Sequence, residues 1–142
     1  MAALRKVQVW ILIDLPNKQA VLLLKTSPQR GSFWQPVTGS VEKEESDLTA
    51  ALREATEETG LKIAQEQLQA LNYSFSFFRG SEQIEETVFF VKLNGTTAPA
   101  IMLDNREHSE FKWCSLKQAM VDLKFDSNRK ALSLLITKGS SS

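Results

Sequence analysis

Residues 39–61 read GSVEKEESDLTAALREATEETGL, and this stretch decides the fold and the chemistry of the chain. Ser46 is a good helix N-cap, and the acidic Asp47 after it suits the positive end of a helix. Most of the following residues are strong helix formers, and Gly60 is a typical C-terminal stop. The pattern therefore predicts a helix over 47–59.

At about 100° per residue, this helix would carry two neighbouring stripes. The packing stripe contains Leu48, Ala51, Leu52, Ala55 and Thr59. The other stripe gathers the carboxylates of Glu54, Glu57 and Glu58, and like charges at such spacings cost roughly 0.2–0.5 kcal/mol per pair. Arg53 can reach Glu57 but cannot neutralise three acids, whereas Mg²⁺ or Mn²⁺ prefers clustered carboxylate oxygens. The alternative is a solvated acidic face without a metal ion.

The segment fits the pattern G-x5-E-x7-R-E-U-x-E-E-x-G-U at every defined position, where U is a bulky or small aliphatic residue. In this it resembles the Nudix hydrolases, which cleave nucleoside diphosphates linked to a further group with the help of divalent cations. The resemblance implies an α/β fold, an α/β/α sandwich with a mixed β-sheet. It also implies that Glu54, Glu57 and Glu58 bind the metal, while Arg53 and Glu45 hold the carboxylates in place.

Three further motifs resemble one branch of that family, the bacterial dihydroneopterin triphosphate pyrophosphatases, also described as dATP pyrophosphohydrolases. They are FWQPVTGSVE at 33–42, EHSEFKW at 107–113 and SNRKA at 127–131. By this resemblance Glu107 supplements the metal ligands, and it or a glutamate of residues 39–61 is the candidate base. The approach to Glu107 departs from the usual spacing of the branch, which leaves Glu110 as a competing register.

Several other residues are candidates for binding, each with a structural alternative. Backbone groups at Thr38, beside Gly39, can approach a metal or phosphate closely. The candidate substrate-binding residues are Trp34 for ring stacking, Lys25 and Arg30 for phosphates, and Ser127, Asn128 and Arg129 at a helix N-terminus. The alternatives are an aromatic core residue, solvated loop cations and simple helix capping, respectively. Glu86 matches a family glutamate, but a surface charge at a hairpin end is equally plausible.

The implied activity is a Mg²⁺- or Mn²⁺-dependent pyrophosphohydrolase. It would convert dihydroneopterin triphosphate, a step of folate biosynthesis, or a related nucleoside triphosphate such as dATP, to the monophosphate and pyrophosphate. In that branch the connection after Phe78 is longer and richer in His and Arg, whereas Arg79 is its only cation here. A general pyrophosphatase for (d)NTPs or oxidised nucleotides therefore remains open. A Nudix module that senses nucleotides without cleaving them is disfavoured, because every glutamate of the pattern is present.

Composition narrows the class of protein. The 142 residues are 42% hydrophobic and 24% charged, which suits one domain over 1–138 with a disordered tail at 139–142. Basic and acidic residues balance at 17 each, which argues against nucleic acid as a bulk partner. With one cysteine, Cys114, and neither an apolar signal segment nor a membrane span, we expect a cytoplasmic protein. The expected state is a monomer or homodimer that binds a small-molecule triphosphate.

Hydrophobic patterning predicts the remaining elements. The run 6–14 is almost continuously apolar and predicts a central strand, which forms a hairpin with 20–25. The alternation over 71–78 and the apolar run 87–93 predict a second hairpin. Two helices should follow, at 116–123 after Ser115 and at 128–136 after Asp126 or Ser127.

Overall fold

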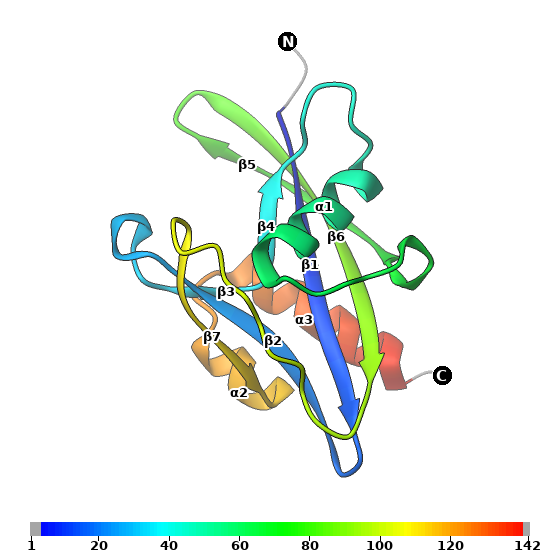
Figure 1. Cartoon of the computed structure of the whole chain (residues 1–142). Helices are drawn as coiled ribbons and strands as arrows, with labels where there is room; N and C mark the ends of the chain where they lie inside the picture. Colours follow the sequence, from blue (N-terminus) through cyan, green and yellow to red (C-terminus); the bar gives the residue numbers. More distant parts are fainter. Residues whose placement is uncertain (1–3, 141–142) are drawn as a thin grey trace.

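The computed structural model describes residues 4–140, with side chains to Thr137, and a mixed seven-stranded sheet lies at its centre (Figure 1). The strands are β1 (Leu4–Leu15), β2 (Lys18–Thr26), β3 (Trp34–Gln35), β4 (Val37–Ser40), β5 (Gln69–Arg79), β6 (Glu82–Asn94) and β7 (His108–Cys114). The helices are α1 (Asp47–Thr59), α2 (Leu116–Asp122) and α3 (Asp126–Ser140), with short 3-10 turns η1 (Pro28–Arg30) and η2 (Gln65–Gln67). This is the α/β architecture that the resemblance implied.

The strand β1 is the centre of the sheet, as its apolar sequence predicted. The sheet order is β3-β2-β1-β6-β5, with β4 also paired to β1 and β7 to β2. All side chains from Val7 to Ile13 are buried, because helices cover both faces of this strand. β6 runs parallel to β1, whereas β2 and β4 run antiparallel to it.

Alternate residues of β1 contribute to two separate cores. Val7, Val9 and Ile11 pack with the alanines of α1 on one face. Trp10 and Leu12 pack on the other face, with residues of α2 and α3. Figure 1 shows α1 and α3 on opposite sides of the sheet. Because side chains alternate along a strand, neighbouring residues of β1 serve different layers.

The antiparallel partner of β1 changes along its length. Its first half pairs with β4, from Lys6↔Ser40 to Val9↔Val37, and its last residues pair with β2, from Leu12↔Val21 onward. The strands β2 and β4 therefore pair with the same edge of β1 at different places and separate from each other in a fork between them. Residues at the end of β2 and in β4 both line one cavity, so the fork positions the site.

The predicted elements are found with changes at their ends. The helix predicted over 47–59 is α1, with the same bounds. The prediction that Asp126 or Ser127 caps the last helix was wrong, because α3 begins at Asp126 and Phe125 accepts the first backbone bonds, from Asn128 and Arg129. Of the tail expected at 139–142, 141–142 lie outside the described residues and the rest belongs to α3. Within 4–140 no helix is long and apolar enough to cross a bilayer.

Candidate active site

Local sequence fixes the helix that carries the carboxylates. The Ser46 hydroxyl accepts a 3.1 Å hydrogen bond from the backbone of Thr49, and Gly60 adopts a left-handed conformation at φ 74° to end the helix. Three small residues, Ala50, Ala51 and Ala55, are fully buried and let α1 approach the sheet closely. The helix therefore sits as a rigid support for its outer glutamates.

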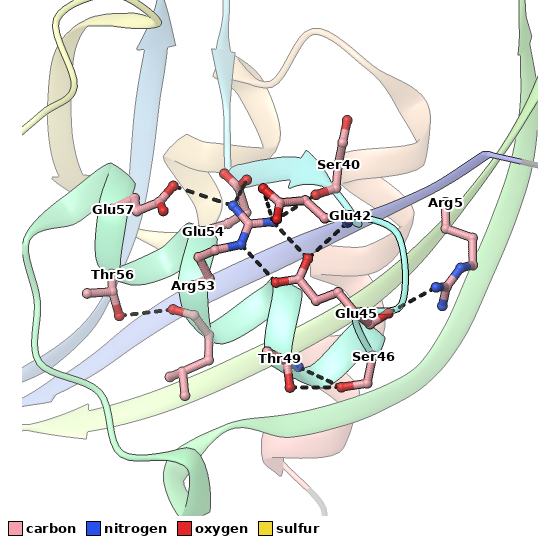
Figure 2. Close-up of polar contacts among 11 residues, drawn as sticks. Arg5, Ser40, Glu42, Glu45, Ser46, Thr49, Arg53, Glu54, Thr56 and Glu57 are labelled. Atoms are coloured by element: carbon pink, nitrogen blue, oxygen red, sulfur yellow. Dashed lines mark hydrogen bonds and ion pairs between the residues drawn. The ribbon is translucent and has the colours of Figure 1, made fainter.

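Arg53 is the hub of the polar contacts on α1 (Figure 2). Its guanidinium binds both carboxylate oxygens of Glu45, at 2.8 and 2.9 Å, and one oxygen of Glu54 at 2.8 Å. It also donates to the backbone oxygen of Ser40 at 3.0 Å and lies 3.5 Å from Glu57. Arg53 thus ties the loop before α1, strand β4 and the helix carboxylates together.

A second cluster joins α1 to the start of β7. Nδ1 of His108 lies 2.7 Å from Oε2 of Glu58, and both side chains are buried. Ligand atoms of Glu58, Glu107 and His108 all lie within 4.8 Å of one another. Oε2 of Glu58 and both ring nitrogens of His108 lack a hydrogen bond of good geometry within the described part of the chain. Buried polar atoms without partners are uncommon, and carboxylate oxygens with an imidazole nitrogen suit a divalent cation.

Burial changes the protonation of these acids. It raises the pKa of Glu58 to about 7, where the nearby Glu107 adds to the rise and His108 opposes it. Burial likewise raises the pKa of Glu54, although Arg53 works against it. The bonds from Arg53 lower the pKa of Glu45 to about 2, so that carboxylate stays ionised. The two buried glutamates therefore lie in a site that favours a compensating positive charge.

A cavity of about 760 Å³ lies on the α3 side of the sheet, at the fork between β2 and β4. Four phenylalanines line it: Phe33, Phe75, Phe77 and Phe125. Arg30, also in its wall, places a guanidinium nitrogen 3.8 Å from a carboxylate oxygen of Glu107. Arg30 therefore links the aromatic cavity to the carboxylate cluster.

The structure brings many of the predicted residues to this region. Glu54, Glu58 and Glu107 interact electrostatically at the cluster, and Glu57 is nearby but more than half exposed. Arg30, Thr38, Ser127 and Asn128 line the cavity. Glu110, the competing register for Glu107, instead pairs with Lys25 on the neighbouring strand at 3.3 Å.

Trp34, Lys25 and Arg129 do not line the cavity. Trp34 pairs with β2 through Lys25 and packs into the core beneath α2, where Lys112 lies 4.2 Å from its ring centre. Phe33, just before β3, takes the cavity position expected for the tryptophan. Arg129 binds the backbone of Leu123 and the carboxylate of Asp126, so it holds the turn between α2 and α3.

Lys6 and Gln8 were not among the sequence candidates, whereas Glu86 was noted there as matching a family glutamate. Gln8 and Lys6 of β1 and Glu86 of β6 lie on the face that carries the cavity. Glu86 is 5% exposed, which excludes the surface-charge reading. A usable signal was present for Gln8, since it is the one polar residue inside the apolar run 7–13. The sequence contained no such signal for the phenylalanines of β5, because an alternating pattern does not show what the strand faces.

Comparison with known proteins places this geometry in a family. The model of the NUDIX domain matches residues 4–135, nearly the whole described chain. The chain belongs to the Nudix family. With each glutamate of the characteristic segment in place and hydrolases among its relatives, it is a Nudix pyrophosphohydrolase.

Relatives of this Nudix chain carry different names. It is 28% identical to dihydroneopterin triphosphate diphosphatase of Escherichia coli K12, over 90% of each chain. The solved E. coli dihydroneopterin triphosphate pyrophosphohydrolase aligns with a TM-score of 0.75 over 93% of this chain and 95% of that one. The present chain is also 32% identical, over 91% of its length, to a Myxococcus xanthus protein named octanoyltransferase. The chain spans only 36% of that protein.

A further solved structure supports the fold alone. An Ap4A hydrolase of C. elegans, in a binary complex, aligns over 99% of this chain and all of that one, with a TM-score of 0.82 and 24% identity.

Proposed function

We propose that this Nudix enzyme hydrolyses a pterin or nucleoside triphosphate to the monophosphate and pyrophosphate, with dihydroneopterin triphosphate as the first candidate. The observation that carries the proposal is the junction between the Glu58–Glu107–His108 cluster and the aromatic cavity, made by Arg30. A flat ring fits between phenylalanine side chains, and its phosphates would extend past Arg30 toward the cluster. The similarity to the E. coli diphosphatase over 90% of both chains supports this choice.

The closely spaced, largely buried ligand atoms of the cluster fit a divalent cation, for which we propose Mg²⁺ or Mn²⁺. Glu58 and Glu107 would hold it, with Glu54 and Glu57 as the further ligands on α1. Such a cation supplies positive charge to phosphate oxygens and lowers the pKa of a bound water. The small-molecule triphosphate is thus the proposed partner, in a cytoplasmic setting.

The protein's own groups have distinct tasks in this hydrolysis. Arg53 fixes the direction of the Glu54 carboxylate, and Arg30 orients the phosphate chain toward Glu107. Glu107, with a side chain 42% exposed and therefore open to solvent, would accept the proton of the attacking water. Water adds to phosphorus as the anhydride bond between the α- and β-phosphates breaks, and pyrophosphate leaves.

A general pyrophosphatase for (d)NTPs is the second candidate. The hairpin that carries Phe75 and Phe77 turns directly from β5 into β6, and Arg79 is its cation at the cavity wall. A short rim of this kind makes fewer contacts to a substrate and would favour a less selective enzyme.

One substrate panel tests both candidates. Pyrophosphate release is measured with Mg²⁺, Mn²⁺ or EDTA from dihydroneopterin triphosphate, the four dNTPs, 8-oxo-dGTP, Ap4A and ADP-ribose. The first candidate predicts the highest kcat/KM for dihydroneopterin triphosphate, and the second predicts similar values across the dNTPs. Absence of cation-dependent release from every triphosphate would overturn the proposed function.

A further inference from the structure

Two hydrogen-bonded polar side chains, Gln8 and Glu86, are buried under the cavity. Gln8 is fully buried and Glu86 is 5% exposed, and they sit on the neighbouring strands β1 and β6. Nε2 of Gln8 donates a 2.6 Å hydrogen bond to Oε2 of Glu86. Buried carboxylates are costly unless they are bonded, so this arrangement calls for an explanation.

The direction of these hydrogen bonds is fixed by Trp10. Its indole nitrogen can only donate, and it lies 2.6 Å from Oε1 of Gln8. The Gln8 amide must therefore turn its NH₂ group toward Glu86, which makes Glu86 the acceptor of the second hydrogen bond. Burial raises the pKa of Glu86, but the Gln8 amide and the nearby Lys6 ammonium oppose that rise. The structure thus holds Glu86 as a hydrogen-bond acceptor in the cavity wall.

A second acceptor lies at the start of α3. The side chain of Asn128 lines the same cavity and is 4% exposed, and its Oδ1 has no hydrogen-bond partner in the described part of the chain. The rest of the wall includes the four phenylalanines, which suit the faces of a planar ring. Acceptors between aromatic walls fit a flat heterocycle with N–H donors along one edge.

We propose that Glu86 determines substrate specificity by binding the 2-amino-4-oxo pyrimidine edge shared by pterins and guanine. This inference rests on the proposed hydrolysis of a pterin or nucleoside triphosphate. That edge presents a ring N–H beside an amino group, two parallel donors that match a carboxylate with its several lone pairs. Adenine instead presents a ring nitrogen that is an acceptor beside its amino group. This ring nitrogen would face a carboxylate oxygen with no hydrogen atom between the two acceptors. The cavity should therefore favour dihydroneopterin triphosphate and dGTP over dATP.

The variant Glu86→Gln tests this inference with little change of shape. The Gln8 amide would still donate to the new side-chain oxygen, so the new NH₂ group would face the cavity and offer a donor where an acceptor stood. We expect kcat/KM for dihydroneopterin triphosphate and dGTP to fall roughly tenfold to a hundredfold, with that for dATP unchanged or raised. Glu85→Gln removes the same charge from an exposed neighbour on the opposite face and should leave all three values unchanged.

Binding measured without turnover separates this inference from the proposed function. Titration calorimetry in EDTA gives the dissociation constants of dGTP and dATP for the wild type and for both variants. A dGTP preference that Glu86→Gln removes supports the inference even if no triphosphate is hydrolysed. Equal weakening of both nucleotides, or a wild type that prefers dATP, overturns it.

Thermal unfolding checks that Glu86→Gln is folded, and Gln8→Met provides a second variant if it is not. Gln8→Met removes the group that orients Glu86 but keeps the carboxylate, so it should reduce the dGTP preference by a smaller factor. An unchanged preference in a folded Gln8→Met protein would show that the hydrogen bonds from Trp10 through Gln8 do not position Glu86.

Discussion

Gly39 of β4 and Glu54 of α1 are packed so closely that no side chain fits between them. A Cβ atom built on Gly39 would lie 2.1 Å from the carboxyl carbon of Glu54 and 2.4 Å from its Oε2. The position of the Glu54 carboxylate is therefore determined by the Gly39 backbone, which has no side chain, and by the guanidinium of Arg53. A glycine is needed here for close approach.

Gly39→Ala should displace the Glu54 carboxylate without unfolding the protein. A shift of about 1 Å at a reacting group can lower turnover about a hundredfold, so we expect a loss of that order in kcat. Gly95→Ala is the matched control, because the nearest atom to its added Cβ is 3.4 Å away and it lies outside the site. Steady-state kinetics measures kcat, and thermal unfolding checks that both variants are folded. A Gly39→Ala enzyme with normal kcat would contradict the role of Gly39 in placing the Glu54 carboxylate.

Arg53→Lys keeps the positive charge but cannot reproduce the paired bonds to Glu45. Lysine offers a point charge where arginine offers a planar fork, so Glu45, Glu54 and Ser40 would lose their common donor. We expect at least a tenfold fall in kcat and a free energy of unfolding lower by roughly 1–3 kcal/mol. Arg5→Lys is the control: Arg5 lies on β1 and pairs with Asp47 at the start of α1, and its substitution should change kcat and the free energy of unfolding less. Urea titration measures the change in the free energy of unfolding, and steady-state kinetics measures the change in kcat.

Glu58→Gln removes the charge at the centre of the buried cluster. The amide keeps the size of the side chain but is a poor ligand for a hard cation, so cation-dependent turnover should fall at least a hundredfold. The exposed Glu66 provides the control variant Glu66→Gln, which should retain full activity. Full turnover of Glu58→Gln in Mg²⁺ would exclude Glu58 as a ligand.

The raised pKa of Glu58 predicts a pH dependence of stability in the metal-free protein. Its folded value of about 7 lies above the ordinary carboxyl value of 4.5, so the folded state binds the proton more tightly than the unfolded state. The free energy of unfolding should therefore decrease as pH rises from about 5 to about 8. Urea unfolding in EDTA measures this decrease, which should be smaller in Glu58→Gln. Equal slopes in the two proteins would contradict the assignment.

Local patterns predicted α1 and β1 well, because capping residues and a continuous apolar run act over short distances. Long-range packing decided the cavity, and sequence patterns did not reveal it. Glu86, Phe75 and Asn128 belong to β6, β5 and α3, and only the folded sheet brings them to one wall. For Phe33 and Trp34 the sequence could not tell which aromatic ring enters the core, since that depends on the pairing of β3 with β2.

The alternation along β1 has a consequence for how this enzyme can change over evolutionary time. Odd-numbered residues such as Val7 and Val9 support the helix that bears the carboxylates, whereas Lys6 and Gln8 lie on the face that carries the cavity. Substitutions at the even positions can thus alter the choice of ring while the layer beneath the hydrolytic groups keeps its packing. If the cavity selects the substrate as proposed, mutations on one face of β1 would change selectivity while mutations on the other would change the support of the carboxylates.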